Sequence, residues 1–545
     1  MCGFALVVGP RAAEAQAEFD AMVTAIAPRG KRLEFESTDD ALVATARLRI
    51  VDRDHAIQPW ASSDGRWSLC YNGEVFNHGD LRKRLESEGI ARRSLSDSEV
   101  VLEAFIAWGE DVLLEFRGEF AFAAFDHATG AVFLARDPAG VKPLYWARSQ
   151  GRIHVASEVK AFTSLGAKVF EVPPGHCGTA MCGQDPVLHP YVDLLRLGDG
   201  QPVLDDVDEA KAAVVATYRQ AIARRVDTDL PVGVILSGGL DSSLALIHVK
   251  ELHPDCTAFT VGTPGSEDLA YARRLTRDVG VPHEVVTVRP RDIGLAEVRE
   301  AIRVSEATEY GDAINAVVSL KVFERVHQSG IKVVITGDGS DELFGGYDMY
   351  RDVARADRRR LFLHKITQLS RTELQRVDRT SMGQQVEARV PYLDLDLLLL
   401  SMRIPSDLKV RDGYEKWILR EAFADVLPDY ILARHKNPMS HSSGLHERIR
   451  LFKPLFPRIY RSYGYDVLAP MRRDFSVELL RHDNDLDAAR AAAAKGGDYS
   501  TSERVRDFAG ALRWNLRNAA VANRGPAADP GVDLPTGTSS ARGDG

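Results

Sequence analysis

The sequence predicts two regions of different architecture: a sheet-rich α+β region, followed by an α/β region with a parallel sheet. The first 165 or so residues contain short apolar runs separated by turn-forming stretches, which is typical of antiparallel strands. From about residue 205, apolar runs alternate with segments of helical spacing, which indicates a parallel sheet covered on both faces. A chain of 545 residues is also too long for one hydrophobic core.

Individual elements can be assigned to both regions. In the first region we expect strands at residues 4–8 (FALVV), 41–51, 67–71, 120–125, 131–136 and 153–157, with turns at 127–130 (HATG) and 149–151 (SQG). In the second, a helix after residue 205 precedes strands at 230–236 (LPVGVIL), 257–262, 283–288 and 331–337. Beyond about residue 355 the chain looks mainly helical. Its Gly-, Pro-, Ser- and Asp-rich end is expected to be disordered.

Composition narrows the classes of function. The 69 basic and 78 acidic residues give a net charge of −9, which disfavours nucleic acid as the main partner. The five cysteines are odd in number and show neither a CxxC pair nor a zinc-finger spacing, so the sequence predicts no disulfide framework and no metal cluster. No apolar run approaches the roughly 18 residues of a membrane span. We therefore expect a cytoplasmic protein without a membrane partner.

One strand-to-helix turn has the composition of a phosphate site. The run SGGLDSS (237–243) follows LPVGVIL and precedes a helical segment, so backbone N–H groups and the helix dipole converge on the turn. It has no Walker lysine, which favours a cradle for a departing pyrophosphate, with Asp241 and a second acid holding Mg²⁺. TGDGSDELFGGY (336–347) offers that acid at the end of another predicted strand, where Asp338 and Asp341 lie. The first turn alone is equally well explained as a tight loop.

A cysteine directly follows the initiator methionine and opens an apolar run. A thiol at a frayed terminus would be idle and oxidisable, which suggests a use for Cys2. Together with SGGLDSS, TGDGSDELFGGY and VEARVPYLD (386–394), it makes the chain, from Cys2 to about residue 450, resemble the glutamine-hydrolysing asparagine synthetase family. The resemblance implies an N-terminal-nucleophile (Ntn-type) glutaminase sandwich (αββα) over 2–195 and a pyrophosphatase-loop synthetase domain over 205–515, with a disordered tail at 522–545.

In that family the methionine is removed and Cys2 becomes the nucleophile of a glutaminase. Its free α-amine can relay the thiol proton, and attack on the glutamine amide gives a thioester and ammonia. The resemblance assigns further residues to glutamine: Asn72 and Gly73 as oxyanion donors, Arg47 as the clamp of the carboxylate, and Glu74 and Asp97 as ligands of the ammonium. Taken singly, these could be a surface arginine, a hairpin turn and a helix N-cap.

For the second domain the resemblance implies that ATP and Mg²⁺ activate a carboxylate as an acyl-adenylate, which ammonia then attacks. Asp338 and Lys436 become candidate catalytic residues, and Asp241 and Asp341 candidate metal ligands. Lys436 is otherwise explained as part of a solvated basic turn. The candidate ATP-binding residues are Leu236, Ser237, Gly238, Gly239, Asp241, Ser242, Val261, Thr336 and Gly337.

The acceptor is less closely defined by the sequence. Glu309 and Asp312 in SEATEYGDAIN (305–315) are candidates for binding a substrate amine. Aspartate is the expected acceptor, with AMP and pyrophosphate as products, and another carboxylate from a natural-product or cell-envelope pathway is the alternative. Two other classes are disfavoured: an RNA-modifying enzyme by the acidic charge, and a storage protein with a decayed site by the retained motifs.

Two further expectations come from the resemblance. A homodimer is expected. The segment PRGKR (28–32) lacks the proline and aspartate of the family's RGPD-like pattern, so the details of the glutamine lid should differ here.

Overall fold

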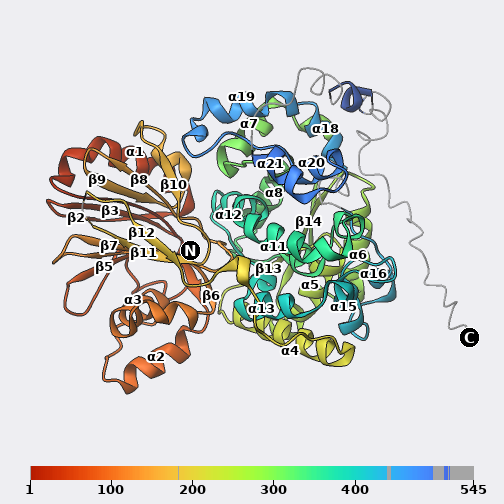
Figure 1. Cartoon of the computed structure of the whole chain (residues 1–545), viewed down its shortest axis with the longest axis horizontal. Coiled ribbons are helices and arrows are strands. Elements are labelled where there is room, and N and C mark those ends of the chain that lie inside the picture. Colours follow the sequence, from red (N-terminus) through yellow and green to blue (C-terminus); the bar gives the residue numbers. More distant parts are fainter. Residues whose placement is uncertain (1, 182, 438–443, 495–507, 514, 516–545) are drawn as a thin grey trace, which may run out of the picture.

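The computed structural model describes residues 2–181, 183–437, 444–494, 508–513 and 515. It contains a sheet-rich N-terminal half and a helix-rich C-terminal half, which lie side by side in Figure 1. The tail expected to be disordered, 522–545, lies outside the described residues. None of the helices in the described part of the chain is long and apolar enough to cross a membrane.

Two six-stranded sheets build the N-terminal half. The first has the order β10-β8-β9-β1-β3-β2, from β1 (Cys2–Val8), β2 (Arg32–Ser37), β3 (Ala41–Arg47), β8 (Tyr145–Ser149), β9 (Arg152–Ala156) and β10 (Val169–Glu171). The second has the order β12-β11-β7-β6-β5-β4, from β4 (Trp60–Ala61), β5 (Trp67–Val75), β6 (Gly118–Asp126), β7 (Ala131–Arg136), β11 (His176–Ala180) and β12 (Val187–Pro190). Their strand pairs are antiparallel, as the turn-separated apolar runs predicted.

These sheets are the inner layers of a four-layer sandwich. Alternate residues of β1 face opposite ways: Phe4 and Leu6 pack between the sheets, whereas Ala5 and Val7 pack towards α1 (Gln16–Ile26). On the outer side, α2 (His78–Ser87) and α3 (Asp97–Trp108) cover the second sheet. Because both faces of β1 are covered, all seven of its residues are buried. The predicted αββα arrangement is confirmed.

A five-stranded parallel sheet forms the centre of the C-terminal half. Its order is β15-β14-β13-β16-β17, from β13 (Val232–Ile235), β14 (Thr257–Gly262), β15 (His283–Thr287), β16 (Val333–Ile335) and β17 (Glu387–Arg389). All four strand pairs are parallel, as predicted. The sequence analysis did not anticipate β17, an edge strand of this sheet, because two of its three residues are charged; in the fold both are buried and form an ion pair with each other.

Helices cover both faces of this sheet. One face packs against helices that include α4 (Val207–Val226), α5 (Leu240–Leu252) and α6 (Glu267–Val279), and the other against α7 (Leu295–Ser305) and α8 (Tyr310–Gln328). The region beyond residue 355 is mainly helical, as expected: its helices are α11 (Arg358–Gln368), α12 (Glu373–Met382), α13 (Leu395–Arg403), α14 (Ser406–Lys409), α15 (Trp417–Ala422), α16 (Asp429–Leu432), α18 (His446–Arg450), α19 (Phe456–Ser462), α20 (Phe475–Arg481) and α21 (Leu486–Ala494). Two short helices, α9 (Ser340–Phe344) and α10 (Met349–Asp352), lie in the sequence between strand β16 and this region.

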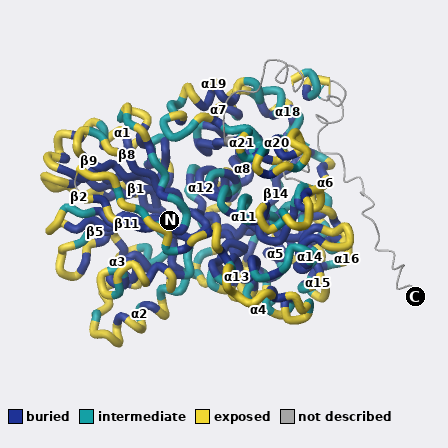
Figure 2. The backbone as a smooth tube through the Cα atoms, viewed as in Figure 1, coloured by how far each residue is buried: buried dark blue, intermediate teal, exposed yellow. Residues whose placement is uncertain are grey.

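The two halves meet through buried ion pairs. Arg29 contacts Asp378 of α12 at 2.8 Å, and Arg225 of α4 contacts Glu119 of β6 at 2.9 Å. Figure 2 shows buried backbone continuing from β1 towards α12 and α13. The last strand of the sandwich ends at Pro190, and the first helix of the C-terminal half, α4, begins at Val207. The domain limits 2–195 and 205–515 stay predictions.

Candidate active sites

Cys2 is the first residue of β1 and lies opposite Arg47, the last residue of β3, in the strand register. The Cys2 side chain is buried and lines a small pocket together with Arg47, Gly73, Glu74 and Asp97. The fold therefore brings five of the predicted glutaminase residues together in one pocket, although they come from four separate segments of the chain.

Asn72 adjoins this pocket from β5. The backbone N–H of Cys2 donates to Asn72 Oδ1 at 3.2 Å, which orients the side-chain amide. The Asn72 side chain is fully buried, and its Nδ2 has no hydrogen-bond partner among the described residues. A buried donor without a partner is costly unless something else accepts from it. Asn72 Nδ2 is therefore available to an oxygen that enters the pocket.

Gly73 is required at its position by the close approach of two strands. Its φ is +153°, and a Cβ there would lie 2.2 Å from the carbonyl oxygen of Glu119 on β6. A larger residue would push β5 away from β6 and displace Asn72, because the two residues are consecutive. The glycine thus supports the geometry around Cys2.

Arg47 and Asp97 are held by their own partners at the pocket wall. The Arg47 guanidinium donates to the carbonyl oxygens of Ala56 and Asp52, the latter at 3.1 Å. Asp97, at the start of α3, accepts from the Tyr71 hydroxyl at 2.8 Å. One positive and one negative group at the same pocket suit a ligand that carries both an ammonium and a carboxylate.

Glu74 reaches the pocket but is already engaged. Its carboxylate accepts a hydrogen bond from Arg389 of β17, so it joins the two halves of the chain. Burial and nearby Glu387 raise the pKa of Glu74 well above its usual range, while Arg389 opposes that shift. The structure therefore gives Glu74 a partner that the sequence analysis did not foresee.

Burial also affects the candidate nucleophile. It raises the pKa of the Cys2 thiol above its usual value, and the positive charge of Arg47 only partly opposes this. A thiol with a raised pKa is mostly protonated near pH 7, so it needs a base to act as a nucleophile.

Arg29 is a residue of this region that the sequence analysis missed. Its Nε donates to the backbone oxygen of Cys2 at 3.1 Å, and its terminal nitrogens contact Glu158 at 2.7 Å and Asp378 at 2.8 Å. The side chain is 1% exposed. Its only signal in the sequence was the departure of PRGKR from the family pattern, because its partners lie 129 and 349 residues away.

The second candidate site lies where β13 passes into α5. Ser237 N–H donates to Ser242 Oγ at 3.2 Å, and the Ser242 hydroxyl donates to Gly239 O at 3.2 Å, which closes the turn. Gly238 has a φ of +70°, and a Cβ there would lie 2.5 Å from Tyr271 Cβ. The small residues of SGGLDSS are therefore needed for a tight turn against α6.

This loop separates a basic pocket from an acidic one. The basic pocket is lined by Ser237, Gly239 and Asp241 together with four cationic side chains, Lys416, Arg420, Arg434 and Lys436; Asp268 and Glu415 also line it and pair with Arg434 and Arg420. The other pocket, of about 220 Å³, is lined by the acids Asp338, Asp341, Glu342 and Glu373 and by Arg376, which pairs with Asp338. Ser237, Asp241 and Lys436 line both. The basic pocket suits phosphate groups, and the acidic pocket suits a group of positive charge.

The two predicted metal ligands converge on one cation. Asp241 and Asp341 both contact the Lys416 ammonium, and Asp341 also contacts Lys436. Burial raises the pKa of Asp341, but the two lysines outweigh it and hold that pKa far below its usual range. Two carboxylates that share one cation have the hard oxygen donors that Mg²⁺ prefers, so these residues fit such an ion in place of the ammonium. The sequence analysis missed Lys416, which lies 175 residues from Asp241.

The remaining predicted residues divide between pocket and core. Thr336, Gly337 and Asp338 line the acidic pocket; Arg376 donates to Asp338 at 3.0 Å, and the buried Thr336 Oγ1 has no partner among the described residues. By contrast, Leu236 and Val261 are packed in the two hydrophobic cores beneath the sheet's end.

The two acids proposed for a substrate amine are not among the residues that line the acidic pocket. Asp312 is buried 3.8 Å from Arg376, and burial and Glu373 raise its pKa well above the usual range. Burial and Asp474 raise the pKa of Glu309 to about 8. Neither lines the acidic pocket, whose wall carries Glu342 and Glu373 instead.

Comparisons with known proteins agree with this geometry. Residues 1–180 match the family described as "Glutamine amidotransferase domain", and residues 213–361 and 353–500 match the family "Asparagine synthase". The chain is 31% identical to asparagine synthetase B (glutamine-hydrolyzing) of Escherichia coli over 426 residues, 75% of this chain and 76% of the relative. It is also 31% identical to asparagine synthetase (glutamine-hydrolyzing) 3 of Arabidopsis thaliana over 434 residues, 74% of this chain and 72% of the relative.

Among solved structures, a glutamine phosphoribosylpyrophosphate amidotransferase of B. subtilis aligns with a TM-score of 0.30 and 17% identity, covering 62% of this chain and 81% of that one. The family matches, by contrast, cover both halves, and together they confirm the resemblance noted in the sequence. The chain belongs to the asparagine synthase family and is an ATP-dependent carbon–nitrogen ligase with a glutamine amidotransferase domain.

Proposed function

We propose that glutamine hydrolysed at Cys2 supplies ammonia to a carboxylate that ATP adenylates at the loop 237–242. The expected acceptor is aspartate and the expected products are asparagine, AMP and pyrophosphate. The observation that carries this proposal is the buried Cys2 beside Asn72, whose Nδ2 has no partner among the described residues, in one chain with a loop between a basic and an acidic pocket.

At the first site, the sulfur of Cys2 attacks the side-chain carbonyl carbon of glutamine. The α-amine that is freed when Met1 is removed takes the thiol proton and passes it to the departing nitrogen, so ammonia leaves and a thioester remains. Asn72 Nδ2 and the Gly73 N–H stabilise the oxyanion. Water then hydrolyses the thioester to glutamate and restores the thiol.

Arg47 and Asp97 position glutamine for this attack. The Arg47 guanidinium pairs with the α-carboxylate, and Asp97 accepts from the α-ammonium. Glu74 contributes less directly, because Arg389 already occupies its carboxylate. Its role is then to connect the glutamine pocket to β17 of the synthetase half.

At the second site, the acceptor carboxylate attacks the α-phosphorus of ATP and pyrophosphate leaves. The basic pocket takes the departing phosphates, whose charge Lys416, Lys436 and the N–H groups of the loop neutralise. Asp241 and Asp341 would hold Mg²⁺, which supplies further charge neutralisation for the pyrophosphate. Ammonia then attacks the acyl carbon and AMP leaves.

The acidic pocket favours a second candidate acceptor. Its wall carries the buried Glu342 and the partly buried Glu373, and burial and Glu373 raise the pKa of Glu342 to about 8, although Lys365, 3.7 Å from Glu373, opposes that shift. Clustered carboxylates of this kind are stabilised by a bound cation. A carboxylate that bears an amine or guanidine at some distance from the reacting group would place a positive charge beside these acids, as the ammonium of aspartate would. The alternative to aspartate is therefore an acceptor of this kind, amidated by the same reaction.

A product assay separates the two acceptors. The purified chain is incubated with ATP, Mg²⁺ and glutamine, and with either aspartate or a panel of longer amino- and guanidino-carboxylates, and AMP is measured by chromatography. AMP formed in proportion to asparagine supports the first candidate, and AMP formed only with a longer cationic acceptor supports the second. Release of ADP, or no nucleotide turnover with any acceptor, would overturn the proposal.

A further inference from the structure

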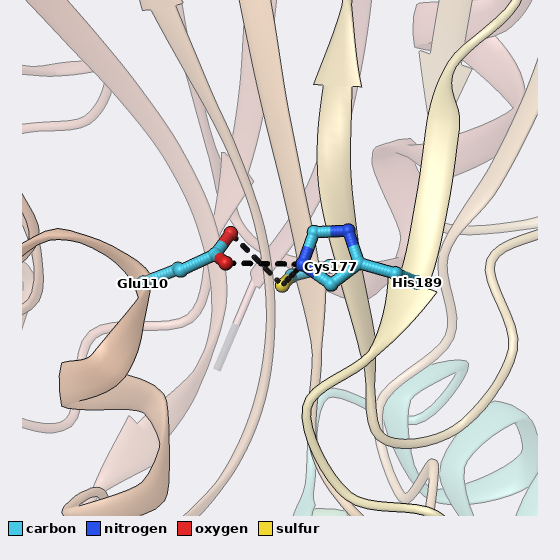
Figure 3. Close-up of side chains that lie close together, drawn as sticks. All are labelled: Glu110, Cys177 and His189. Carbon is cyan, nitrogen blue, oxygen red and sulfur yellow. Dashed lines mark hydrogen bonds and ion pairs between the residues drawn. The ribbon is translucent and has the colours of Figure 1, made fainter.

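Three potential metal ligands meet on the outer side of the glutaminase half, apart from both active sites. They are Cys177 of β11, His189 of β12 and Glu110 of the 3₁₀ helix Gly109–Leu114 that follows α3. Cys177 and His189 are direct cross-strand partners in the β11–β12 pair, so the strand register places their side chains together. Figure 3 shows the three side chains pointing towards one another.

Their spacing matches one face of a tetrahedral zinc site. Zinc bonds of about 2.3 Å to sulfur and about 2.0 Å to nitrogen and oxygen place sulfur about 3.5 Å from either other ligand, and nitrogen about 3.3 Å from oxygen. In this protein Cys177 Sγ lies 3.5 Å from His189 Nε2 and 3.7 Å from one Glu110 oxygen, Oε2, whereas the other oxygen, Oε1, lies 3.1 Å from His189 Nε2; one ligand atom from each residue lies within 4.8 Å of the other two. An ion could bind there with little movement of these side chains.

The arrangement does not match a nucleophile with its base. In a catalytic triad the carboxylate contacts one imidazole nitrogen and the nucleophile the other. Here Cys177 and Glu110 both contact Nε2 of His189. Three side chains whose ligand atoms lie this close together can share an ion, but this arrangement does not pass a proton from the thiol through the imidazole to the carboxylate.

We propose that Glu110, Cys177 and His189 bind a Zn²⁺ ion. A thiolate, a carboxylate and a neutral imidazole balance its charge, and this mixture of soft and borderline donors favours zinc over magnesium or calcium. The side chains of His189 and Glu110 are 47% and 48% exposed, which leaves the fourth position to water. These three residues show no zinc-site spacing along the chain, because Glu110 lies 67 residues before Cys177.

The bound ion would fix the end of α3 to the second sheet. The 3₁₀ helix that carries Glu110 follows α3 directly, and α3 begins with Asp97 of the glutamine pocket. Because the ligand residues come together only in the folded chain, zinc should stabilise the folded protein.

Cobalt substitution tests the site on the full-length, metal-free protein. We expect one equivalent of Co²⁺ to produce a thiolate-to-cobalt charge-transfer band in the near ultraviolet and the visible bands of tetrahedral Co²⁺. Zinc should abolish both and raise the melting temperature. Cys177→Ser should lose the charge-transfer band, and Glu110→Gln, a change at a half-exposed side chain, should weaken Co²⁺ binding in a protein whose circular dichroism matches the parent's.

Two cysteine variants serve as matched controls. Cys256→Ser changes another buried cysteine, located just before β14, and Cys2→Ala removes the candidate nucleophile. Both should keep the band. The proposal is overturned if the parent protein gives no band, if the band survives Cys177→Ser, if it disappears with Cys2→Ala, or if Glu110→Gln binds Co²⁺ as the parent does. Because no readout depends on ATP or glutamine, failure here leaves the proposed ligase reaction untouched.

Discussion

Replacing Asn72 by alanine tests the chemistry assigned to the Cys2 pocket. The side chain is buried, its Oδ1 accepts from the Cys2 N–H, and its Nδ2 points to no protein acceptor in the described part of the chain. If that donor stabilises the oxyanion, Asn72→Ala removes an interaction that becomes strong only in the transition state. The glutaminase kcat should then fall while the KM for glutamine changes little.

The structure sets the size of this effect. One preorganised donor in a water-excluded site contributes about 2.7–4 kcal/mol to the transition state, which is about 10²–10³ in kcat. Asn72 has no solvent exposure, so water cannot replace its Nδ2 in the variant. We therefore expect the upper part of that range. Gly73 N–H remains as the second donor and should leave activity above background.

The assay is glutamate release from glutamine, run beside ammonium-dependent synthesis in the same preparation. Asn77→Ala is a matched control: Asn77 follows the same strand, but its Nδ2 donates to Glu115 O at 3.0 Å and its Oδ1 accepts from Arg117 N–H. It should keep the parent glutaminase rate. An unchanged kcat in Asn72→Ala, or a loss of ammonium-dependent synthesis equal to the loss of glutaminase activity, would refute the assignment.

Four further perturbations separate the parts of the proposed reaction. Cys2→Ala should abolish glutamine-dependent synthesis and leave ammonium-dependent synthesis intact; loss of both in a folded variant would contradict separate sites. Asp241→Asn should suppress formation of AMP and pyrophosphate and spare glutaminase activity, as measured by nucleotide chromatography and glutamate release. Arg29→Met should destabilise the chain by about 3 kcal/mol in urea unfolding, because it leaves carboxylates buried without their partner, and adding Asp378→Leu should recover part of the loss. The KM for a cationic acceptor should fall as pH rises through about 8. Burial raises the pKa of Glu342 to about 8, and this carboxyl must lose its proton before it pairs with the cation. A constant KM across that range would argue against the pairing.

Local patterns predicted the regular elements well. The run AVFLAR at 131–136 coincides with β7, and TAFTVG at 257–262 coincides with β14. Both are apolar runs bounded by polar or turn-forming residues, so their burial could be inferred without knowing their neighbours. By contrast, β17 consists of Glu387, Ala388 and Arg389, and its two charged residues are buried in an ion pair with each other and in one with the distant Glu74, which no local pattern reveals.

The same distinction applies to the sites. Motifs that surround a backbone turn, such as SGGLDSS, could be located from the sequence, because the chemistry of the turn is local. The partners of those motifs could not be: Lys416 between the two aspartates, Arg389 on Glu74 and Arg29 on Cys2 are each supplied by a remote segment. Isolated lysines and arginines carry no pattern that reveals such contacts.

The central claim is that nitrogen released at Cys2 becomes the amide nitrogen of the product formed at the loop 237–242. The most direct test is a reaction with glutamine labelled with ¹⁵N at the side-chain amide, ATP, Mg²⁺, the acceptor identified by the product assay, and an excess of unlabelled ammonium. We expect mass spectrometry to find the label in the product amide, with one AMP formed per labelled product. A product that carries only unlabelled nitrogen, while labelled ammonium accumulates in solution, would contradict it.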